Sequence, residues 1–245
     1  MTTSVSDHSG TRVQEPDVVH DAVEPIPPAV SACGLQLDGK RGRIYGPIEA
    51  EVPAGSLTLV TGKAGSGKTS LLLSLVGRMR PNRGSDLVVL GRSLPSRARW
   101  VQRRTAAVGV HGLDDLDEEV SVAATIRERE AWLAPWWQIV RTPDDERVAQ
   151  VCVPVFGDHP VPSARQLIHE LDEAANLQLR LALALLSHPQ LIVVDDLDSL
   201  RDLDSRHRVA ASLRALTEQG VTVIAAAASA DELHRLGDSV GHIAL

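Results

Sequence analysis

The strongest constraint on this chain is a glycine-rich octapeptide with the pattern G-x-x-x-x-G-K-T, formed by Gly62, Lys63, Ala64, Gly65, Ser66, Gly67, Lys68 and Thr69. A turn this rich in glycine exposes successive backbone N–H groups that can surround a phosphate. In such a loop the lysine reaches the β- and γ-phosphates, and the hydroxyl of the last residue coordinates Mg²⁺. The chain has only three lysines, and two of them lie in this loop. The motif therefore predicts a nucleoside triphosphate site.

The segments around the loop have the order that such a site requires. Residues 57–60 read as a short buried strand, and residues 70–76, which begin with Ser70, read as an apolar helix. Further apolar segments at 191–194 and 221–226 each follow a helical stretch. Strands that alternate with helices predict an α/β fold with a mostly parallel sheet and a nucleotide at the carboxyl ends of its strands.

Composition narrows the class of protein. A length of 245 residues and a hydrophobic fraction of 43% suit one α/β domain with a small insert. The net charge of −7 argues against a nucleic-acid partner. We expect no membrane span, because no run of about 18 apolar residues occurs, and no secretion signal. Two cysteines without metal-ligand spacing favour a reducing cytoplasm. Residues 1–30 are acidic and contain prolines, which predicts a disordered tail before a domain at 31–245.

A second motif identifies a family. The apolar segment 191–194 ends in Asp195 and Asp196, and a helix with a proline stop, residues 181–189, precedes it. This arrangement, 127 residues after Lys68, resembles the ATP-binding cassette (ABC) ATPases of ABC transporters, over roughly residues 32–245. An aspartate in the position of Asp195 can hold Mg²⁺ across from the phosphate loop, together with Thr69.

The resemblance implies a P-loop NTPase fold of ABC type with a small antiparallel β part and a helical subdomain inserted at roughly 112–180. It implies ATP and Mg²⁺ as cofactors, and a homodimer or a heterodimer with another ABC ATPase. It also implies an integral membrane permease subunit on a separate chain. The protein would then be cytoplasmic and peripheral at the inner face of the cell membrane through that partner.

The signature motif of the family, L-S-G-G-Q, is degenerate in this chain. It aligns with Leu171-Asp172-Glu173-Ala174-Ala175, so only the leucine is retained. In the family this helix N-terminus binds the γ-phosphate held by the partner subunit. Here Asp172 would serve as an N-cap, and two carboxylates would face the phosphate. Like charges at ~4 Å repel by about 4 kcal/mol at an effective dielectric constant of 20, so we expect a weak ATP-bound dimer.

Other catalytic positions of the family also differ. The general base is usually glutamate and is here Asp196, which either acts as a slow base or only orients water, since a misplacement near ~1 Å can cost about 10²-fold in rate. The switch histidine aligns with Ala228. The Q-loop glutamine aligns with His111, which either contacts a metal-bound water or is a plain loop histidine. No aromatic residue stands where the family stacks adenine, and Tyr45 nearby is expected to pack in the small sheet.

The expected helical subdomain contains a tryptophan cluster, Trp132, Trp136 and Trp137. Trp132 and Trp136 share a helical face if Pro135 permits the helix to continue. The cluster is either part of a small core or a docking surface, since tryptophan is enriched where partners bind. The acidic run 114–119 before it is interpreted as a solvated loop and not as a metal site.

The leading functional hypothesis is an ABC-type ATPase domain that binds Mg-ATP and hydrolyses it slowly, to drive or regulate a membrane permease. The alternative is a catalytically weak, ATP-dependent scaffold or regulatory subunit. A small-molecule phosphotransferase fits the position of the paired acids less well.

Overall fold

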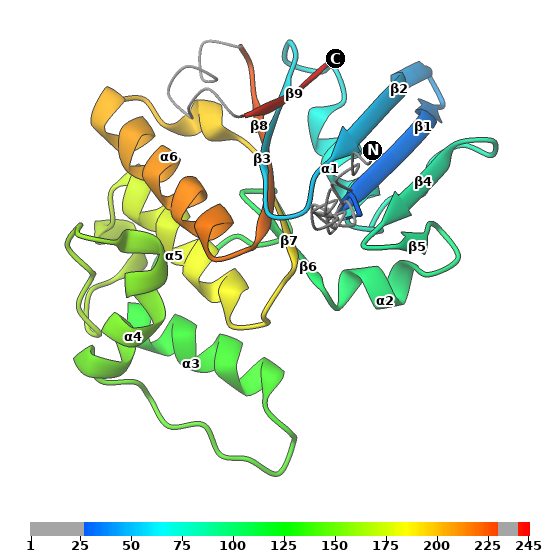
Figure 1. Cartoon of the computed structure of the whole chain (residues 1–245). Coiled ribbons are helices and arrows are strands. Elements are labelled where there is room, and N and C mark those ends of the chain that lie inside the picture. Colours follow the sequence, from blue (N-terminus) through cyan, green and yellow to red (C-terminus); the bar gives the residue numbers. More distant parts are fainter. Residues whose placement is uncertain (1–26, 230–239) are drawn as a thin grey trace, which may run out of the picture.

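The computed structural model describes residues 27–229 and 240–245. A parallel sheet of five strands forms the centre of the molecule (Figure 1). Its strand order is β6 (Thr105–Val108), β7 (Leu191–Val194), β8 (Thr222–Ala227), β3 (Leu57–Thr61) and β9 (Gly241–Ala244). Helices flank this sheet, and a smaller antiparallel sheet adjoins it, so the predicted fold class is confirmed. The strand β9, which pairs with β3, was not foreseen from the sequence.

The small antiparallel sheet has the strand order β2 (Gly42–Val52), β1 (Val30–Gly39), β4 (Asp86–Val89) and β5 (Arg92–Ser93). Tyr45 of β2 is 3% exposed and its hydroxyl donates a hydrogen bond of 2.7 Å to Ser74 Oγ. Ser74 belongs to α1, so this buried bond ties the small sheet to the helix that follows the phosphate loop. The expectation that Tyr45 packs in the small sheet is confirmed.

The helices fall into two groups along the chain. The helices α1 (Lys68–Leu75) and α2 (Ala98–Gln102) lie between β3 and β6. Between β6 and β7 the chain forms α3 (Val122–Leu133), α4 (Asp145–Phe156), the 3₁₀ turn η1 (Ile168–Glu170) and α5 (Glu173–Leu185). The turn η2 (Leu197–Ser199) and α6 (Leu203–Glu218) connect β7 to β8. The expected tail at 1–30 lies outside the described residues except for its last four positions. None of the described helices is long and apolar enough to cross a bilayer.

Strand periodicity explains how the central sheet holds two apolar cores. Successive side chains of a strand point to opposite faces. In β7, Ile192 and Val194 pack with the helices α4, α5 and α6, whereas Leu191 and Val193 pack with α1 and the small sheet. All four are fully buried. A strand buried on both faces reads as a continuous apolar run, which is why the sequence predicted this strand with its observed bounds.

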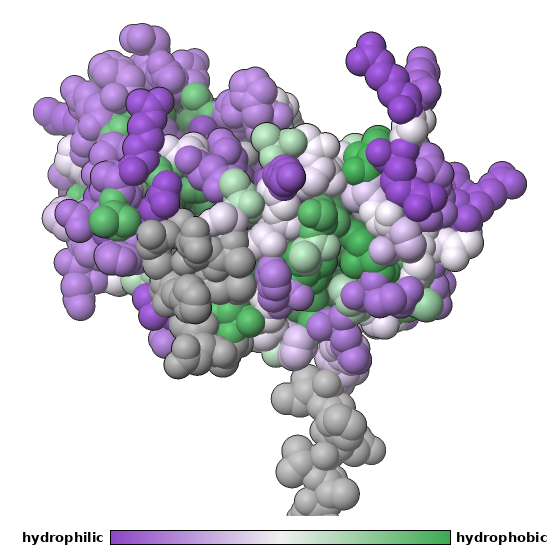
Figure 2. All heavy atoms as spheres, turned by 90° about the horizontal axis from the view of Figure 1, so that it is seen from above, coloured by the Kyte–Doolittle hydropathy of each residue, from purple (hydrophilic) through white to green (hydrophobic). Residues whose placement is uncertain are grey.

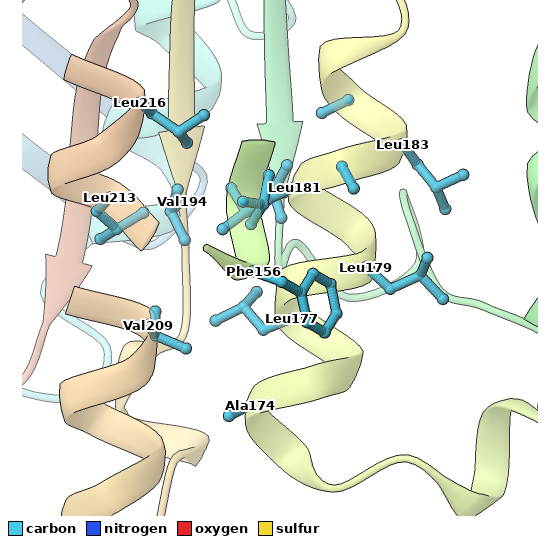
Figure 3. Packing of buried hydrophobic residues seen from close by; sticks show 14 of the residues in the cluster. Phe156, Ala174, Leu177, Leu179, Leu181, Leu183, Val194, Val209, Leu213 and Leu216 are labelled. Atoms are coloured by element: carbon cyan, nitrogen blue, oxygen red, sulfur yellow. The ribbon is translucent and has the colours of Figure 1, made fainter. Parts of the chain in front are cut away.

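The core on the α4–α6 side depends on Phe156, the only phenylalanine of the chain. Figure 3 shows its ring among leucines of α5, and it is 1% exposed. We expect Phe156→Ala to lower the free energy of unfolding by about 3–5 kcal/mol, because the cavity adds to the lost transfer energy. Urea denaturation measures this. Val153→Ala on the same helix is the control, since Val153 is 51% exposed and should change stability little. Equal losses in the two variants would contradict the packing.

Candidate nucleotide-binding site

The phosphate loop is held between β3 and α1 and packs against the backbone of β2. Gly67 precedes the helix with a φ of +93°, and a Cβ built on it would lie 2.5 Å from the carbonyl oxygen of Ile44. Only glycine fits this position, since both the left-handed conformation and the close approach exclude a side chain. Lys68 Nζ donates hydrogen bonds to the carbonyl oxygens of Gly62, at 2.6 Å, and Lys63, at 3.2 Å. Its ammonium group is therefore held over the loop.

The second half of the site comes from β7. The strands β3 and β7 are parallel and are separated only by β8, so their carboxyl ends open at the same edge. In Figure 1, β3, β8 and β9 run toward the upper edge of the molecule, which Figure 2 shows from above. Hydrophilic residues cover most of this edge in Figure 2, with hydrophobic residues gathered near its middle. The nucleotide site predicted at this edge thus lies on a largely hydrophilic surface.

Thr69 and Asp195, 126 residues apart, are in direct contact, because Thr69 Oγ1 donates a hydrogen bond to Asp195 Oδ2. Asp195 is 7% exposed, and its backbone N–H donates to the carbonyl of Val108 at 2.8 Å. Gly109 supports it from the end of β6: its φ is +74°, and a Cβ there would lie 2.4 Å from the carbonyl oxygen of Asp195. Gly109 was not recognised from the sequence, although a glycine directly after an apolar strand is a signal for close backbone approach.

The donor set fits a nucleotide with Mg²⁺. Ser66 Oγ, inside the phosphate loop, is buried without a hydrogen-bond partner among the described residues, and a phosphate oxygen would satisfy it. Mg²⁺ usually takes one or two protein ligands and completes its octahedron with water and substrate phosphates. Thr69 and Asp195 offer such a pair of oxygens. Within residues 27–229 and 240–245, no group of three His, Cys, Asp or Glu side chains forms a preassembled metal site.

Asp196 follows the metal-ligand candidate in a left-handed backbone conformation, with a φ of +57°. Partial burial of its carboxyl, with the charges of Asp195 and Asp198, raises its pKa, and Lys68 opposes the shift. Asp196 lines a cavity of about 420 Å³ together with Asp195 and His111. The side chain of His111 is fully exposed and its Nδ1 lies 3.4 Å from Asp115 Oδ2. The structure thus places both predicted catalytic residues at one cavity, with His111 turned toward Asp115.

The start of α5, which was aligned with the signature in the sequence, is occupied by side chains of the chain itself. Asp172 caps α5, as expected, and its Oδ1 accepts a hydrogen bond of 2.6 Å from the N–H of Ala175. Its Oδ2 accepts another from Arg208 Nη1 at 2.8 Å. Burial alone would raise the pKa of Asp172, but the bonds from Ala175 and Arg208 lower it below its ordinary value. Asp172 is therefore an ionised carboxylate that is neutralised within its own chain.

Glu173, the second acid at this position, has an arginine of its own. Its Oε2 accepts a hydrogen bond of 3.0 Å from the backbone N–H of Arg201, and its Oε1 lies 3.4 Å from Arg201 Nε. Arg201 lies in the short connection between η2 and α6. The expectation of two free carboxylates at this end needs refinement, because each is paired with an arginine that sequence reasoning did not single out.

Two further expectations concern neighbouring loops. Ala228, which was expected in the position of the switch histidine, is exposed, and its N–H donates a hydrogen bond of 2.8 Å to Asp198 Oδ1. The interpretation of residues 114–119 as a solvated loop is wrong for Asp114. Its side chain is only 20% exposed and its Oδ2 accepts a hydrogen bond of 2.8 Å from the N–H of Gly109. It therefore braces the glycine that supports Asp195.

The tryptophan cluster is not part of a core, so that interpretation is wrong. Trp132, Trp136 and Trp137 are 79%, 92% and 70% exposed. The helix α3 ends at Leu133 because Pro135 cannot continue it, which leaves Trp136 and Trp137 in the connection to α4. The docking interpretation is the one that an exposed cluster supports.

Comparisons with known proteins agree with this architecture. The family model described as ABC transporter matches residues 45–199. The Nod factor export ATP-binding protein I of Mesorhizobium japonicum is 29% identical over 210 residues, which cover 86% of this chain and 59% of that protein. The protein of the same name from Rhizobium meliloti is 29% identical over 187 residues, or 76% of this chain and 53% of that one. The chain thus spans somewhat more than half the length of these relatives.

Solved structures show the same fold. An ATP-binding cassette of an ABC transporter in its ADP conformation superposes with a TM-score of 0.71 at 14% identity, over 88% of this chain and 87% of that one. For cbiO1 from Clostridium perfringens, described as part of the ABC transporter complex cbiONQ, the TM-score is 0.70 at 16% identity, over 88% and 84% of the two chains. With the family model covering most of the described chain, this protein belongs to the ABC transporter family as an ATP-binding domain.

Proposed function

We propose that this protein binds Mg-ATP through its phosphate loop and hydrolyses it slowly, and that it drives or regulates a membrane permease on a separate chain. The observation that carries the proposal is the contact between Thr69 and Asp195, which brings two Mg²⁺-binding oxygens together beside the phosphate loop. The unsatisfied hydroxyl of Ser66 in the same loop supports a phosphate there. The N–H groups of the loop and Lys68 would hold the phosphates.

The residues expected near the attacking water support slow hydrolysis of ATP. Bound Mg²⁺ would neutralise charge that develops on the transferred phosphoryl group. Asp196 can accept a proton from a water in the 420 Å³ cavity, and its raised pKa makes it a somewhat stronger base than an ordinary aspartate. Aspartate is one methylene shorter than the glutamate of the family. Its carboxylate is therefore less well placed to take a proton from the water, which would lower the rate. Ala228 offers only its backbone where the family has a histidine.

The proposed partners follow from the family. The cbiO1 neighbour is described as part of a multi-subunit transporter complex, and the curated relatives are named as export ATP-binding proteins. Such proteins work with membrane subunits, and we place this chain at the inner face of the membrane through its permease. We propose the boundaries 31–245 for the cassette, with a helical insert at roughly 112–180 that would include α3, α4 and the first part of α5.

A steady-state ATPase assay on the purified chain, alone and with an intact ABC ATPase partner, tests the proposal. We expect slow phosphate release that requires Mg²⁺. ATP binding without any phosphate release, in either condition, would favour the alternative, in which ATP only sets the conformation of a scaffold.

The variant Asp196→Asn tests whether the protein hydrolyses ATP or only binds it. We expect it to lower phosphate release by about 10²-fold, within the range for loss of general base catalysis, while ATP affinity is retained. Asp158→Asn, at an exposed position after α4, is the matched control. If Asp196→Asn turns over like the control, Asp196 is not the base.

A further inference from the structure

An arginine-rich surface surrounds α2. Residues 92–104 contain five arginines and no acidic residue, in a chain with a net charge of −7. With Arg78, which lies beside Arg103, they form a group that we call the arginine patch: Arg78, Arg92, Arg97, Arg99, Arg103 and Arg104. All are exposed except the half-buried Arg104. The patch thus carries six positive charges on one part of an acidic protein.

Two arginines of the patch contact a tryptophan, but no ion pair among the described residues neutralises the charges of the patch. Trp100 holds two of its members, because the guanidinium carbons of Arg104 and Arg92 lie 4.0 Å and 5.0 Å from the centre of the indole ring. In the part of the chain that the structure describes, no carboxylate forms an ion pair with any arginine of the patch. Six unpaired guanidinium groups create a positive field that attracts an anionic partner.

A hydrophobic projection lies next to the patch. It is the connection from α3 to α4, and its tip carries Trp136, Trp137 and Ile139, which are 92%, 70% and 90% exposed. No acidic residue occurs from 131 to 143. The connection lines a hollow of about 980 Å³ together with α4 and the end of α5. A hydrogen bond of 3.1 Å from Arg127 Nε to the carbonyl of Val140 joins the connection to α3. We call this connection the tryptophan arch.

The patch and the arch lie on the same side of the molecule. A hollow of about 630 Å³ is lined by Arg78 and Arg103 of the patch and by Trp132 and Leu133, at the end of α3 where the arch begins. The carboxylates of Asp114, Asp115 and Glu128 line the same hollow, so an anionic partner is expected at the exposed arginines outside it. Arg129 of α3 lines this hollow too, and its pKa is lowered by burial and by the charge of Arg78. Figure 1 shows α2 and the connection after α3 along the lower edge, away from the upper edge to which β8 and β9 run.

We propose that the arginine patch and the tryptophan arch together bind directly to the anionic headgroups of a phospholipid bilayer. Guanidinium groups pair with phosphate in a bidentate manner and give up water more readily than ammonium groups. Tryptophan is enriched at the level of the headgroups, where its ring is buried and its N–H stays wet. This contact is independent of the permease.

The experiment is sedimentation of the full chain with phosphatidylcholine vesicles, with or without phosphatidylglycerol, in the absence of any permease. We expect binding only to vesicles that contain phosphatidylglycerol, and weaker binding as salt rises. Arg97→Gln with Arg99→Gln should weaken binding by about 30-fold, since each arginine near an anionic surface contributes about a factor of five. Arg165→Gln with Arg214→Gln, two exposed arginines elsewhere, is the charge-matched control.

The arch is tested by a second pair of variants. Trp136→Ala with Trp137→Ala should weaken vesicle binding and remove the blue shift of tryptophan emission that lipid insertion produces. Val153→Ala with Leu203→Ala removes two other exposed apolar side chains and should change neither. Equal binding to both kinds of vesicle, or equal losses in the test and control variants, would overturn the proposal. Binding to a detergent-solubilised permease without any vesicle binding would assign the surface to a protein instead.

Discussion

Lys68→Ala is expected to abolish binding of a fluorescent ATP analogue, with a loss of affinity of about 10²-fold or more, because hydrogen bonds to charged groups contribute about 1.5–3 kcal/mol each. Lys68 is the first residue of α1 and its ammonium lies over the phosphate loop, 2.6 Å from the carbonyl of Gly62. Of the other two lysines, Lys63 lies earlier in the loop, where its carbonyl oxygen accepts a hydrogen bond from Lys68, and Lys40 lies in the turn of the antiparallel sheet. Titration of the analogue in the presence of Mg²⁺ measures the effect.

The control for this prediction is Lys40→Ala, which removes a lysine charge from an exposed turn. Alanine is a good helix former, so Lys68→Ala should leave α1 intact, and circular dichroism checks this. Retained affinity in a folded Lys68→Ala variant would mean that the loop does not bind the phosphates. The assignment of the site and the proposed function would then both fail.

Local patterns in the sequence predicted the edge of the sheet that carries the phosphate loop. The strands β3 and β7 are buried on both faces, so each reads as an unbroken apolar run that ends at a polar motif. Thr69 and Asp195 meet because parallel strands end at the same edge. The apolar runs can be read directly from the sequence. The parallel topology follows from their alternation with helices, and it explains why Thr69 and Asp195 meet.

The partners of exposed charges could not be predicted in this way. Asp172 pairs with Arg208, 36 residues away, and no periodicity marks one polar residue of α6 as its partner. Asp114 looked like a member of a solvated acidic run, yet it is half-buried against Gly109. The tryptophans were ambiguous for a local reason: whether Trp136 continues the helical face of Trp132 depends on one proline, and the helix ends before it.

Asp172 and Glu173 each pair with an arginine of the same chain. This pairing changes the effect that we expect the degenerate signature to have on ATP binding between two subunits. Arg208 and Arg201 reduce the net charge at the start of α5, so simple repulsion of a phosphate is weaker than two free carboxylates would give. The hydrogen bond from Ala175 to Asp172 remains, however, and it occupies an N–H group that the family leaves for the γ-phosphate. The obstacle is thus a helix end that is already satisfied within its own chain.

Replacing Asp172, Glu173 and Ala174 by Ser, Gly and Gly is expected to strengthen ATP-dependent dimerisation and to raise the ATPase rate of the chain alone. The change removes both carboxylates, and the serine retains an N-cap at the start of α5. The released Arg208 and Arg201 would add positive charge where a partner's phosphate arrives. Because Asp196 and Ala228 still limit the chemistry, the rate should rise less than dimerisation does. Sedimentation velocity with and without Mg-ATP, followed by a phosphate-release assay, measures both effects.

The matched control is Asp144→Ser with Glu146→Gly, which removes two carboxylates from the start of α4 and keeps a serine cap there. It should change neither dimerisation nor turnover, although both variants alter the net charge by the same amount. A heterodimer offers a second comparison, since an intact partner supplies its own signature to Lys68 and Asp195 of this chain. There the substitution at 172–174 should act only on the site formed with the partner's phosphate loop. If the substituted chain dimerises and turns over like the control, the start of α5 does not meet the γ-phosphate, and the alignment of the signature with residues 171–175 is mistaken.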